Sequence, residues 1–545
     1  MTSRPIVFSG GPILTMAEPL RVEAIAIGGD RILCVGSVED CRTVAGADRV
    51  ERDLAGRTLI PGFVDAHCHP LMLGQTQSWL DVSPSVAPSL AALIARLETH
   101  ARGLPPGVPL RAFGYDYRRL DERRHPLARD LDQAATDREI YVMNVSGHGG
   151  SINSFGLAVH GITAATPDPP GGEIGRYPDR TPNGLLWDAA CDLLTGDDGV
   201  KIGNHGPNIH LPEPPDVAAR LLDHALEQFL RAGITTVVDA QVSRREAEAY
   251  IAARDAGRLR VRVNMLVISA LLEDVLQLGL VGRLGDEELA FIGIKLYADG
   301  ALGGLTAYFP NGYASEPDNH GVLYHEPGEF RALVRRAHRA GLQTGTHAQS
   351  PTAIGMVIDA LEAVQREWPR FDMRHAIEHC GLPTDDAIAR MAQADIIPVS
   401  QPQHHRSFGD GVARTVGGAL GRRLNPIGLY ARAGIPIVLS SDAPVAAPRP
   451  LEAVQAAVDR QTVGGTVLGS AELRIDVLSA LRGYTIGGAY RAHREDLIGS
   501  LEPGKLADLA ILADDPLSVR VADLSSIQVE ETWLGGRPVA GTAVA

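Results

Sequence analysis

Two histidines stand two residues apart in the segment PGFVDAHCHP, at positions 67 and 69. The apolar run that contains them predicts a β-strand, and alternate side chains of a strand project from the same face. Neutral imidazole is a common zinc ligand, with a bond of about 2.0–2.1 Å. His67 and His69 therefore indicate a site for one cation, although two ordinary surface histidines would produce the same pattern.

A lysine at position 295 lies in the apolar run FIGIKLYADG. Burying an unpaired ammonium among apolar residues is costly. Burial and a nearby metal charge would lower the pKa of Lys295, and the neutral amine could then take up CO2 and become a carbamate, an anionic bridging ligand. A salt bridge from Lys295 to Asp299 or to another carboxylate is the competing interpretation.

Three further residues of ligand type end predicted strands: His347 in LQTGTHAQ, His379 in HAIEHC and Asp442 in IPIVLSSDAPV. The carboxylate of Asp442 could bind a metal ion and also take a proton from an attacking water. One such residue alone would usually be a helix cap or a hydrogen-bonding group of the core. Five strand ends that all carry a ligand-type residue predict a metal centre that activates water.

Eight apolar or β-branched runs are the strands that would position these residues. Most are followed by segments of helical periodicity, and the runs cover residues 58–69, 234–241, 260–268, 291–300, 342–348, 375–380, 396–402 and 435–444. Alternating strands and helices predict an α/β fold, here a parallel (β/α)8 barrel of the TIM type. Barrel enzymes carry their catalytic residues at the C-terminal ends of the strands, where Lys295, His347, His379 and Asp442 fall.

The two ends of the chain differ from the middle in their residue pattern. A chain of 545 residues is too long to fold, in most cases, around a single hydrophobic core, so more than one domain is expected. Both ends consist of short β-rich runs and glycine turns, so we predict a composite β-sandwich domain from residues 1–60 and 490–545, beside a barrel over 61–489. The interval from about 70 to 215 is too long for one loop and predicts a subdomain inserted after the first barrel strand.

Composition limits the partners of the protein. The formal net charge is −15, with acidic and basic residues interspersed, which argues against binding nucleic acid. No stretch approaches ~20 uncharged apolar residues, and the start lacks a signal-peptide pattern, so we expect a cytoplasmic protein without a membrane partner. The five cysteines show no CxxC spacing and indicate neither a disulfide framework nor a thiolate zinc site. We expect a small-molecule substrate, and the sequence leaves a homodimer open.

A series of segments resembles the amidohydrolase superfamily and, more narrowly, amidohydrolase family 3, whose members include N-substituted formamide deformylases: PGFVDAHCH, IKLYADGALGGLTA, THA, IEH, SSDAPV and GSLEPGKLADLAIL. The resemblance runs from about residue 58 to the C-terminus. It implies a barrel beside a composite β-sandwich and hydrolysis of C–N bonds. It also implies a ligand set for one or two divalent ions: His67 and His69 on the first, His347 and His379 on the second, carboxylated Lys295 between them, and Asp442 on the first. Zinc is the expected metal, other transition metals stay open, and CO2 would carboxylate the lysine.

Two segments depart from the family pattern and concern the substrate pocket. HAQSPTAIG lacks a carboxylate that commonly follows the histidine of the fifth strand, and SGHGGSINS keeps His148 but lacks a bulky aromatic residue. His148 is a candidate substrate contact, with a role in ordering its own turn as the competing interpretation, and Tyr117 is a second candidate. The predicted rim is otherwise apolar and aromatic, with Trp79, Tyr115, Leu302 and Tyr308.

These residues predict a metal-dependent amidohydrolase that cleaves the C–N bond of a small, neutral N-substituted amide or formamide with metal-activated water. Lys295 and Asp442 are the predicted catalytic residues, and Asp442 would pass a proton to the leaving nitrogen. A deaminase acting on a cyclic amidine is one alternative, which release of ammonia would identify. A non-catalytic ligand-binding relative is another, because a fold alone does not imply a function.

Overall fold

Eight parallel strands form the centre of the structure, a computed structural model that describes residues 4–197 and 199–541. Their order in the sheet is β8, β15, β16, β18, β19, β20, β21 and β22. In that order they span Phe63–Cys68, Ile234–Val242, Arg262–Ile268, Leu289–Tyr297, Gln343–Ala348, Ala376–His379, Ile397–Ser400 and Val438–Leu439. This sheet is the nearly closed eight-stranded barrel that the sequence predicted. The short β17 (Leu284–Gly285) pairs with β18 in the antiparallel sense.

The barrel closes between its last and first strands through the loop that follows β22. The strand predicted over 435–444 is regular for only two residues, Val438–Leu439. Beyond it, Asp442 N donates to His67 O at 2.9 Å, and His69 N donates to Ala443 O at 2.8 Å. These bonds bring the first and last ligand-bearing segments side by side.

Helices cover the outside of the barrel: α6 (Pro215–Arg231), α7 (Arg244–Asp255), α8 (Leu272–Gln277), α9 (Pro327–Arg339), α10 (Pro351–Glu367), α11 (Asp385–Gln393), α14 (Ile427–Arg432) and α16 (Val477–Gly483). Their buried apolar faces pack with outward-facing strand residues in one large core. Side-chain oxygens cap the first turn of several of these helices, as Ser243, Ser350 and Thr384 do for α7, α10 and α11. Four more helices complete this part: α12 (Pro402–Thr415), α13 (Gly418–Gly421), α15 (Pro450–Asp459) and α17 (Ile486–Arg491).

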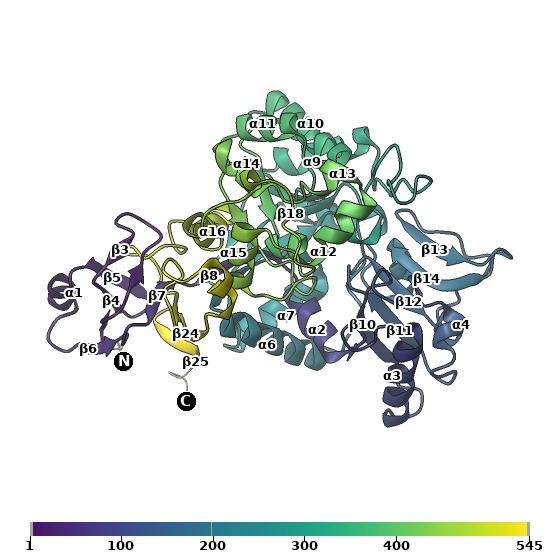
Figure 1. The fold of residues 1–545 in the computed structure, drawn as a ribbon, viewed down its shortest axis with the longest axis horizontal. Coiled ribbons are helices and arrows are strands. Elements are labelled where there is room, and N and C mark those ends of the chain that lie inside the picture. Colours follow the sequence, from purple (N-terminus) through teal and green to yellow (C-terminus); the bar gives the residue numbers. More distant parts are fainter. Residues whose placement is uncertain (1–3, 198, 542–545) are drawn as a thin grey trace.

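Both ends of the chain build a pair of smaller sheets on one side of the barrel (Figure 1). One sheet contains β5 (Arg31–Gly36), β4 (Ala24–Gly28), β1 (Ile6–Ser9) and β6 (Val50–Asp53), with α1 (Val38–Ala45) against it. The other contains β25 (Arg537–Gly541), β24 (Val529–Leu534), β23 (Leu509–Leu512), β7 (Thr58–Pro61), β2 (Ile13–Leu14) and β3 (Arg21–Val22). Because β7 pairs with β23, the N-terminal and C-terminal segments share one sheet.

The run predicted as one strand over 58–69 is therefore two strands in different sheets. The break falls at Gly62, whose backbone N–H donates to Asp508 O at 2.9 Å. A Cβ at this position would collide with the side chain of Thr235, so the two sheets meet more closely than another residue would allow.

The segment between β8 and α6 forms a separate six-stranded sheet on the opposite side of the barrel from the terminal sheets (Figure 1). It contains β13 (Gly172–Arg176), β14 (Pro182–Asp188), β12 (Gly149–Ile152), β11 (Ile140–Asn144), β10 (Leu110–Tyr115) and β9 (Leu80–Asp81), with α2 (Pro70–Ser78), α3 (Leu90–Gly103), α4 (Ala128–Leu131) and α5 (Ser154–Val159). The turn before β12 carries His148. Within the described residues, no helix has both the length and the apolar character needed to cross a membrane.

Candidate active site

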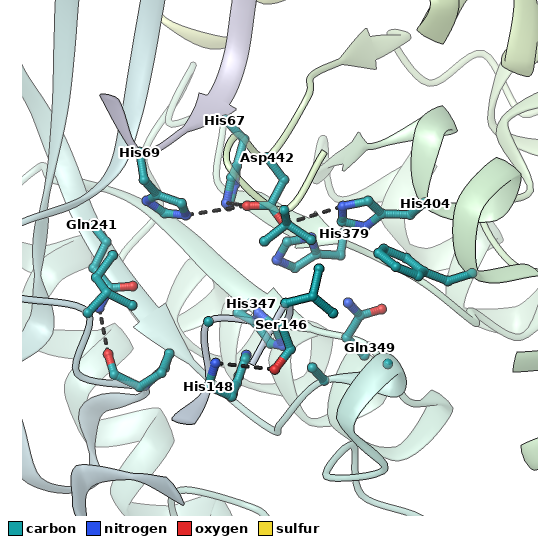
Figure 2. Close-up of a pocket in the computed structure, with 18 of the residues that line it drawn as sticks. His67, His69, Ser146, His148, Gln241, His347, Gln349, His379, His404 and Asp442 are labelled. Carbon is teal, nitrogen blue, oxygen red and sulfur yellow. Dashed lines mark hydrogen bonds and ion pairs between the residues drawn. The ribbon is translucent and has the colours of Figure 1, made fainter. Parts of the chain in front are cut away.

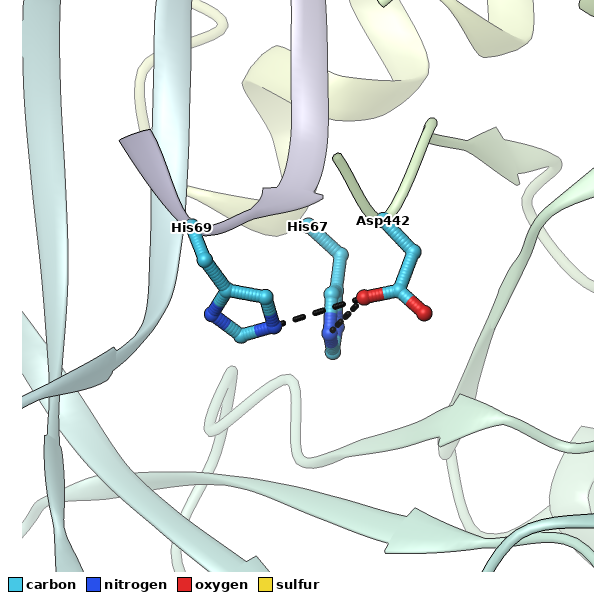
Figure 3. A group of neighbouring side chains, drawn as sticks. All are labelled: His67, His69 and Asp442. Atoms are coloured by element: carbon cyan, nitrogen blue, oxygen red, sulfur yellow. Dashed lines mark ion pairs between the residues drawn. The ribbon is translucent and has the colours of Figure 1, made fainter. Parts of the chain in front are cut away.

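His67 and His69 meet Asp442 at the C-terminal end of the barrel. His67 lies in β8, His69 directly precedes α2, and Asp442 follows β22. The Nε2 atoms of the two histidines lie 3.4 Å and 3.3 Å from Oδ1 of Asp442 (Figure 3). All three side chains are buried. They form one group of donor atoms that could hold a metal ion.

The other oxygen of Asp442 faces a different pair of histidines. Its Oδ2 lies 3.4 Å from Nε2 of His404 and 3.9 Å from Nδ1 of His379. These three residues form a second group of potential metal donors, with ligand atoms within 4.8 Å of one another. Figure 2 shows both groups around one pocket, with Asp442 between them. A single carboxylate is therefore common to the two groups.

The charge on Asp442 is stabilised by its neighbours. Burial raises the pKa of this carboxyl, but hydrogen bonds from His67 and His69 outweigh burial and hold the pKa well below its usual range. For His69, burial lowers the pKa, whereas Asp239 and Asp442 together raise it to about 9. Without a metal ion, a proton on His69 thus partly neutralises the buried carboxylates.

The loop that carries Asp442 is held by a second buried carboxylate. Asp65, in β8, accepts hydrogen bonds from Ser441 N at 3.0 Å and from Ser441 Oγ at 2.6 Å. Asp442 itself has a φ of 60°, in the left-handed region that costs a non-glycine residue free energy. Asp65 therefore helps to keep Asp442 in a backbone conformation that it would rarely adopt alone.

Glu378 orients His67, a role that the sequence did not predict. Its Oε2 lies 2.6 Å from Nδ1 of His67, and its Oε1 accepts a hydrogen bond from Arg491 of α17. Both partners are buried. Burial raises the pKa of Glu378, but Arg491 and His67 lower it by more, so the pKa lies below its usual value. A carboxylate on Nδ1 fixes the ring so that Nε2 faces Asp442, as is common for metal-binding histidines.

The alternation of side chains along a strand predicts that Glu378 points away from the site, because its neighbour His379 is the predicted ligand. Adjacent side chains of a regular strand point to opposite faces. His379 has a φ of 68° and Cys380 a φ of 44°, so the backbone turns out of the strand at this point. Glu378 can then face the barrel interior while His379 faces the pocket.

Lys295 is fully buried in β18, and its Nζ has no hydrogen-bond partner among residues 4–197 and 199–541. This Nζ atom lies 4.6 Å from the centre of the Tyr297 ring. Burial lowers the pKa of Lys295 to about 8, against the opposing charges of Glu378 and Asp442. The competing salt bridge to Asp299 is wrong, because that carboxylate accepts the backbone N–H groups of Gln349, Ser350 and Tyr308 at 2.9, 3.1 and 3.1 Å.

His347 lies on the same rim but in neither of the two donor groups. Its ring centre is 4.5 Å from that of His379, and the ring stacks on Tyr297 at 5.0 Å. Its Nε2 lies 3.1 Å from Gly300 O. Burial, followed by the charge of Lys295, pulls the pKa of His347 well below its usual value, so the ring is neutral.

The pocket beside these residues brings in His148 from the inserted sheet. Nδ1 of His148 lies 2.9 Å from Oδ1 of Asp188, and its ring centre lies 5.7 Å from that of His347. Figure 2 shows both histidines at the pocket. The pocket is also lined by apolar side chains and by one arginine: Met72, Val145, Pro207, Ile209, Phe408, Val445 and Arg118.

Tyr117 is not brought to this pocket, contrary to the sequence-based expectation. It lies in a neighbouring hollow with Trp187 and packs on His125, with ring centres 4.1 Å apart. The other expected rim residues are also absent from the described lining of the pocket: Trp79, Tyr115, Leu302 and Tyr308. Trp79 and Tyr115 belong to the inserted segment, and its packing against the barrel cannot be read from periodicity.

The donor set fits a divalent metal ion. Its atoms are imidazole nitrogens and carboxylate oxygens, which zinc and related metals bind. Burial, followed by the neighbouring His347, holds the pKa of His379 well below its usual value, so this ring is in the neutral form that binds a metal. Nζ of Lys295 and Nε2 of His404 are buried without a partner in the described part of the chain, which is costly unless another group satisfies them.

The amidohydrolase family model matches residues 50–540 of the chain. The chain belongs to the amidohydrolase family. This amidohydrolase is 29% identical to the N-substituted formamide deformylase of Arthrobacter pascens over 523 residues, 94% of each chain. It is a metal-dependent hydrolase that acts on carbon–nitrogen bonds, as the sequence predicted.

Two solved structures share the fold of this amidohydrolase. An uncharacterized metal-dependent hydrolase from Pyrococcus horikoshii OT3 aligns with a TM-score of 0.76 and 24% identity, over 95% of this chain and 99% of that one. An adenosine deaminase from Xanthomonas campestris, solved with bound zinc, aligns with a TM-score of 0.54 and 15% identity, over 99% of this chain and 93% of that one. At these identities the likeness extends to the fold alone.

Proposed function

We propose that this amidohydrolase cleaves small, neutral N-substituted amides or formamides, with zinc as the expected metal. The observation that carries the proposal is the carboxylate of Asp442, which contacts two groups of buried histidines at the mouth of the barrel. His67, His69 and Asp442 would hold one ion, His347 and His379 would hold a second, and carboxylated Lys295 would be a ligand shared by both. When bound, such ions polarise a carbonyl oxygen and lower the pKa of water.

Asp442 is the proposed proton carrier. Its carboxylate is ionised because His67 and His69 hold its pKa well below the usual range despite burial. It can accept a proton from the attacking water and deliver that proton to the leaving nitrogen. Glu378 and Asp65 take no part in this transfer, but they hold His67 and the Asp442 loop in place.

His148 is the proposed contact to the substrate. Asp188 binds its Nδ1 and so orients the ring, which lines the pocket beside His347. With Nδ1 donating to Asp188, Nε2 of the neutral ring can accept a hydrogen bond from the N–H group of the substrate amide, which would place the scissile bond near Asp442.

The pocket lining supports a neutral substrate with an apolar substituent. Met72, Ile209 and Phe408 offer apolar contacts. Arg118 also lines the pocket, but its Nε and one terminal nitrogen are bound to the two oxygens of Asp116 at 2.8 and 2.9 Å. An arginine engaged in this way is poorly placed to clamp a second carboxylate. The sequence similarity to a formamide deformylase favours the same substrate class.

The test is a substrate panel with separate measurement of amine, carboxylate and ammonia. N-benzylformamide and aryl amides would be compared with N-acyl amino acids, cyclic ureas and cyclic amidines. We expect the neutral formamides and amides to be cleaved to amine and carboxylate. Preference for N-acyl amino acids, or ammonia as the sole product, would contradict the proposed substrate class.

A further inference from the structure

His404 stands in the first turn of α12, directly after the seventh barrel strand β21. Its side chain is nine-tenths buried, and its Nε2 faces Oδ2 of Asp442 at 3.4 Å. Within the described ranges this nitrogen has no hydrogen-bond partner. The ring lies parallel to that of His379, with centres 6.0 Å apart and an angle of 17° between the planes. Nε2 of His404 therefore faces the other candidate metal donors and has no hydrogen-bond partner among the described residues.

The next residue on the same helix differs from His404 at Nε2, although its Nδ1 is also without a partner in the described residues. His405 is fully buried, and its Nε2 contacts the carbonyl oxygen of Ala456 at 2.8 Å. His404 has no comparable protein acceptor at Nε2. Leaving a buried polar nitrogen unpaired costs free energy, which a metal ion bound at Nε2 of His404 would recover.

Gln401 fixes which nitrogen of His379 is available beside His404. Its Oε1 lies 2.8 Å from Nδ1 of His379, and its Nε2 donates to Ser440 Oγ at 2.9 Å. The amide is thus oriented with its oxygen toward the imidazole, which must donate from Nδ1. Nε2 of His379 is left as the free donor to a metal, in the arrangement common for metal-binding histidines.

We propose that His404 is a ligand of the second metal ion, together with His379 and Oδ2 of Asp442, and that Asp442 bridges the two ions. This inference rests on the proposed metal-dependent function and extends its ligand set. The bridge follows from geometry, since Oδ1 of Asp442 faces Nε2 of His67 and of His69, whereas Oδ2 faces Nε2 of His404. The second ion would then have protein ligands on the side of α12 as well as on the side of Lys295.

The experiment replaces the native metal of the full-length protein with cobalt(II) and records metal content and the visible and near-ultraviolet spectrum. The variants are His404→Ala, which removes the donor, and His404→Cys, which supplies a thiolate. The matched control is His405→Cys, one residue away on the same helix and directed toward Ala456. The unmodified protein gives the baseline for the five native cysteines.

We expect two cobalt ions per unmodified chain. His404→Ala should weaken the second ion by more than ~100-fold, the upper end of the loss caused by an outer partner of a ligand. His404→Cys should show a new thiolate-to-cobalt charge-transfer band, and His405→Cys should not. The band reports the bond itself, so it separates a ligand from a residue that only shapes the pocket.

Two results would overturn the inference and leave the proposed function standing. One is an unmodified enzyme that hydrolyses amides with a single ion per chain. The other is a His404→Ala variant that keeps both ions with an unchanged cobalt spectrum, together with a His404→Cys variant that shows no charge-transfer band. Full amide hydrolysis by protein shown to be metal-free would instead contradict the proposed function, and the inference with it.

Discussion

The two oxygens of Asp442 contact different histidines, and this makes the residue sensitive to a change of charge. Asp442→Asn keeps the size of the side chain but removes the carboxylate that would carry the proton. We expect kcat to fall by ~10²–10⁴, the usual contribution of a positioned proton-transfer group. Metal content, measured on the same sample, separates loss of the proton carrier from loss of an ion. A kcat equal to that of the unmodified enzyme would contradict the proposed role.

Lys295 is buried without a partner in the described residues, and its pKa of about 8 leaves part of the amine neutral near physiological pH. If its carbamate is the anionic ligand, Lys295→Ala should abolish turnover, and small carboxylates at high concentration should restore part of it. Lys295→Arg should also fail, because a guanidinium is not carboxylated. Turnover and metal content are the measurements, and an active Lys295→Arg variant would exclude the carbamate.

His69 should make the stability of the metal-free protein depend on pH. Its pKa is raised from 6.5 to about 9 in the fold, since Asp239 and Asp442 outweigh burial. The folded state therefore holds this proton more tightly, and the resulting stability is complete below pH 6.5 and lost as pH rises through about 9. We expect the free energy of unfolding to fall by a few kcal/mol over this range. Urea unfolding at both ends of the range measures it, and His69→Gln should flatten the dependence.

At the scale of single elements, β19 must leave room inside the barrel for the Glu378–Arg491 pair. A Cβ at Gly345 would overlap Oε1 of Glu378 and lie 2.8 Å from a terminal nitrogen of Arg491. Gly345→Ala should therefore destabilise the protein by about 1–3 kcal/mol, as overpacking of a core does.

The matched control is Gly355→Ala in the neighbouring helix α10, where a Cβ would meet nothing within 4 Å. Alanine there should be neutral or should stabilise the helix by up to about 1 kcal/mol. Thermal unfolding of both variants is the measurement. Equal effects of the two substitutions would show that the interior of the barrel is not filled as described.

At the scale of the whole molecule, the donors come from the first strand, the sixth strand, the start of α12 and the loop after the last strand. A bound ion would tie together the two ends of the barrel sheet, where regular pairing is shortest. Removing it with a chelator should lower both the unfolding temperature and the activity, and zinc should restore both. Saturation at ~100 times the dissociation constant corresponds to about 2.7 kcal/mol. A double variant, His67→Ala with His69→Ala, should respond less to the chelator.

The sequence by itself predicted the barrel and most of the candidate metal donors. Strand periodicity is local, so His67 and His69 could be placed on one face, and Lys295, His347, His379 and Asp442 could be placed at strand ends. The structure brings His67, His69, His379 and Asp442 together, with His347 beside them. The cytoplasmic location, the homodimer and the domain boundaries stay predictions.

Only the tertiary structure decided which other residues face these donors. Glu378 was concealed because alternation assigns it to the face opposite His379, and left-handed backbone at His379 breaks that alternation. His404 lies on a helix, and the pairing of β21 with β22 brings the start of that helix against Asp442. Tyr117 was expected at the substrate but lies in a neighbouring hollow, since its place depends on how an inserted sheet docks on the barrel. Local patterns report the direction of a side chain within its own element, whereas contacts between distant elements depend on how those elements pack.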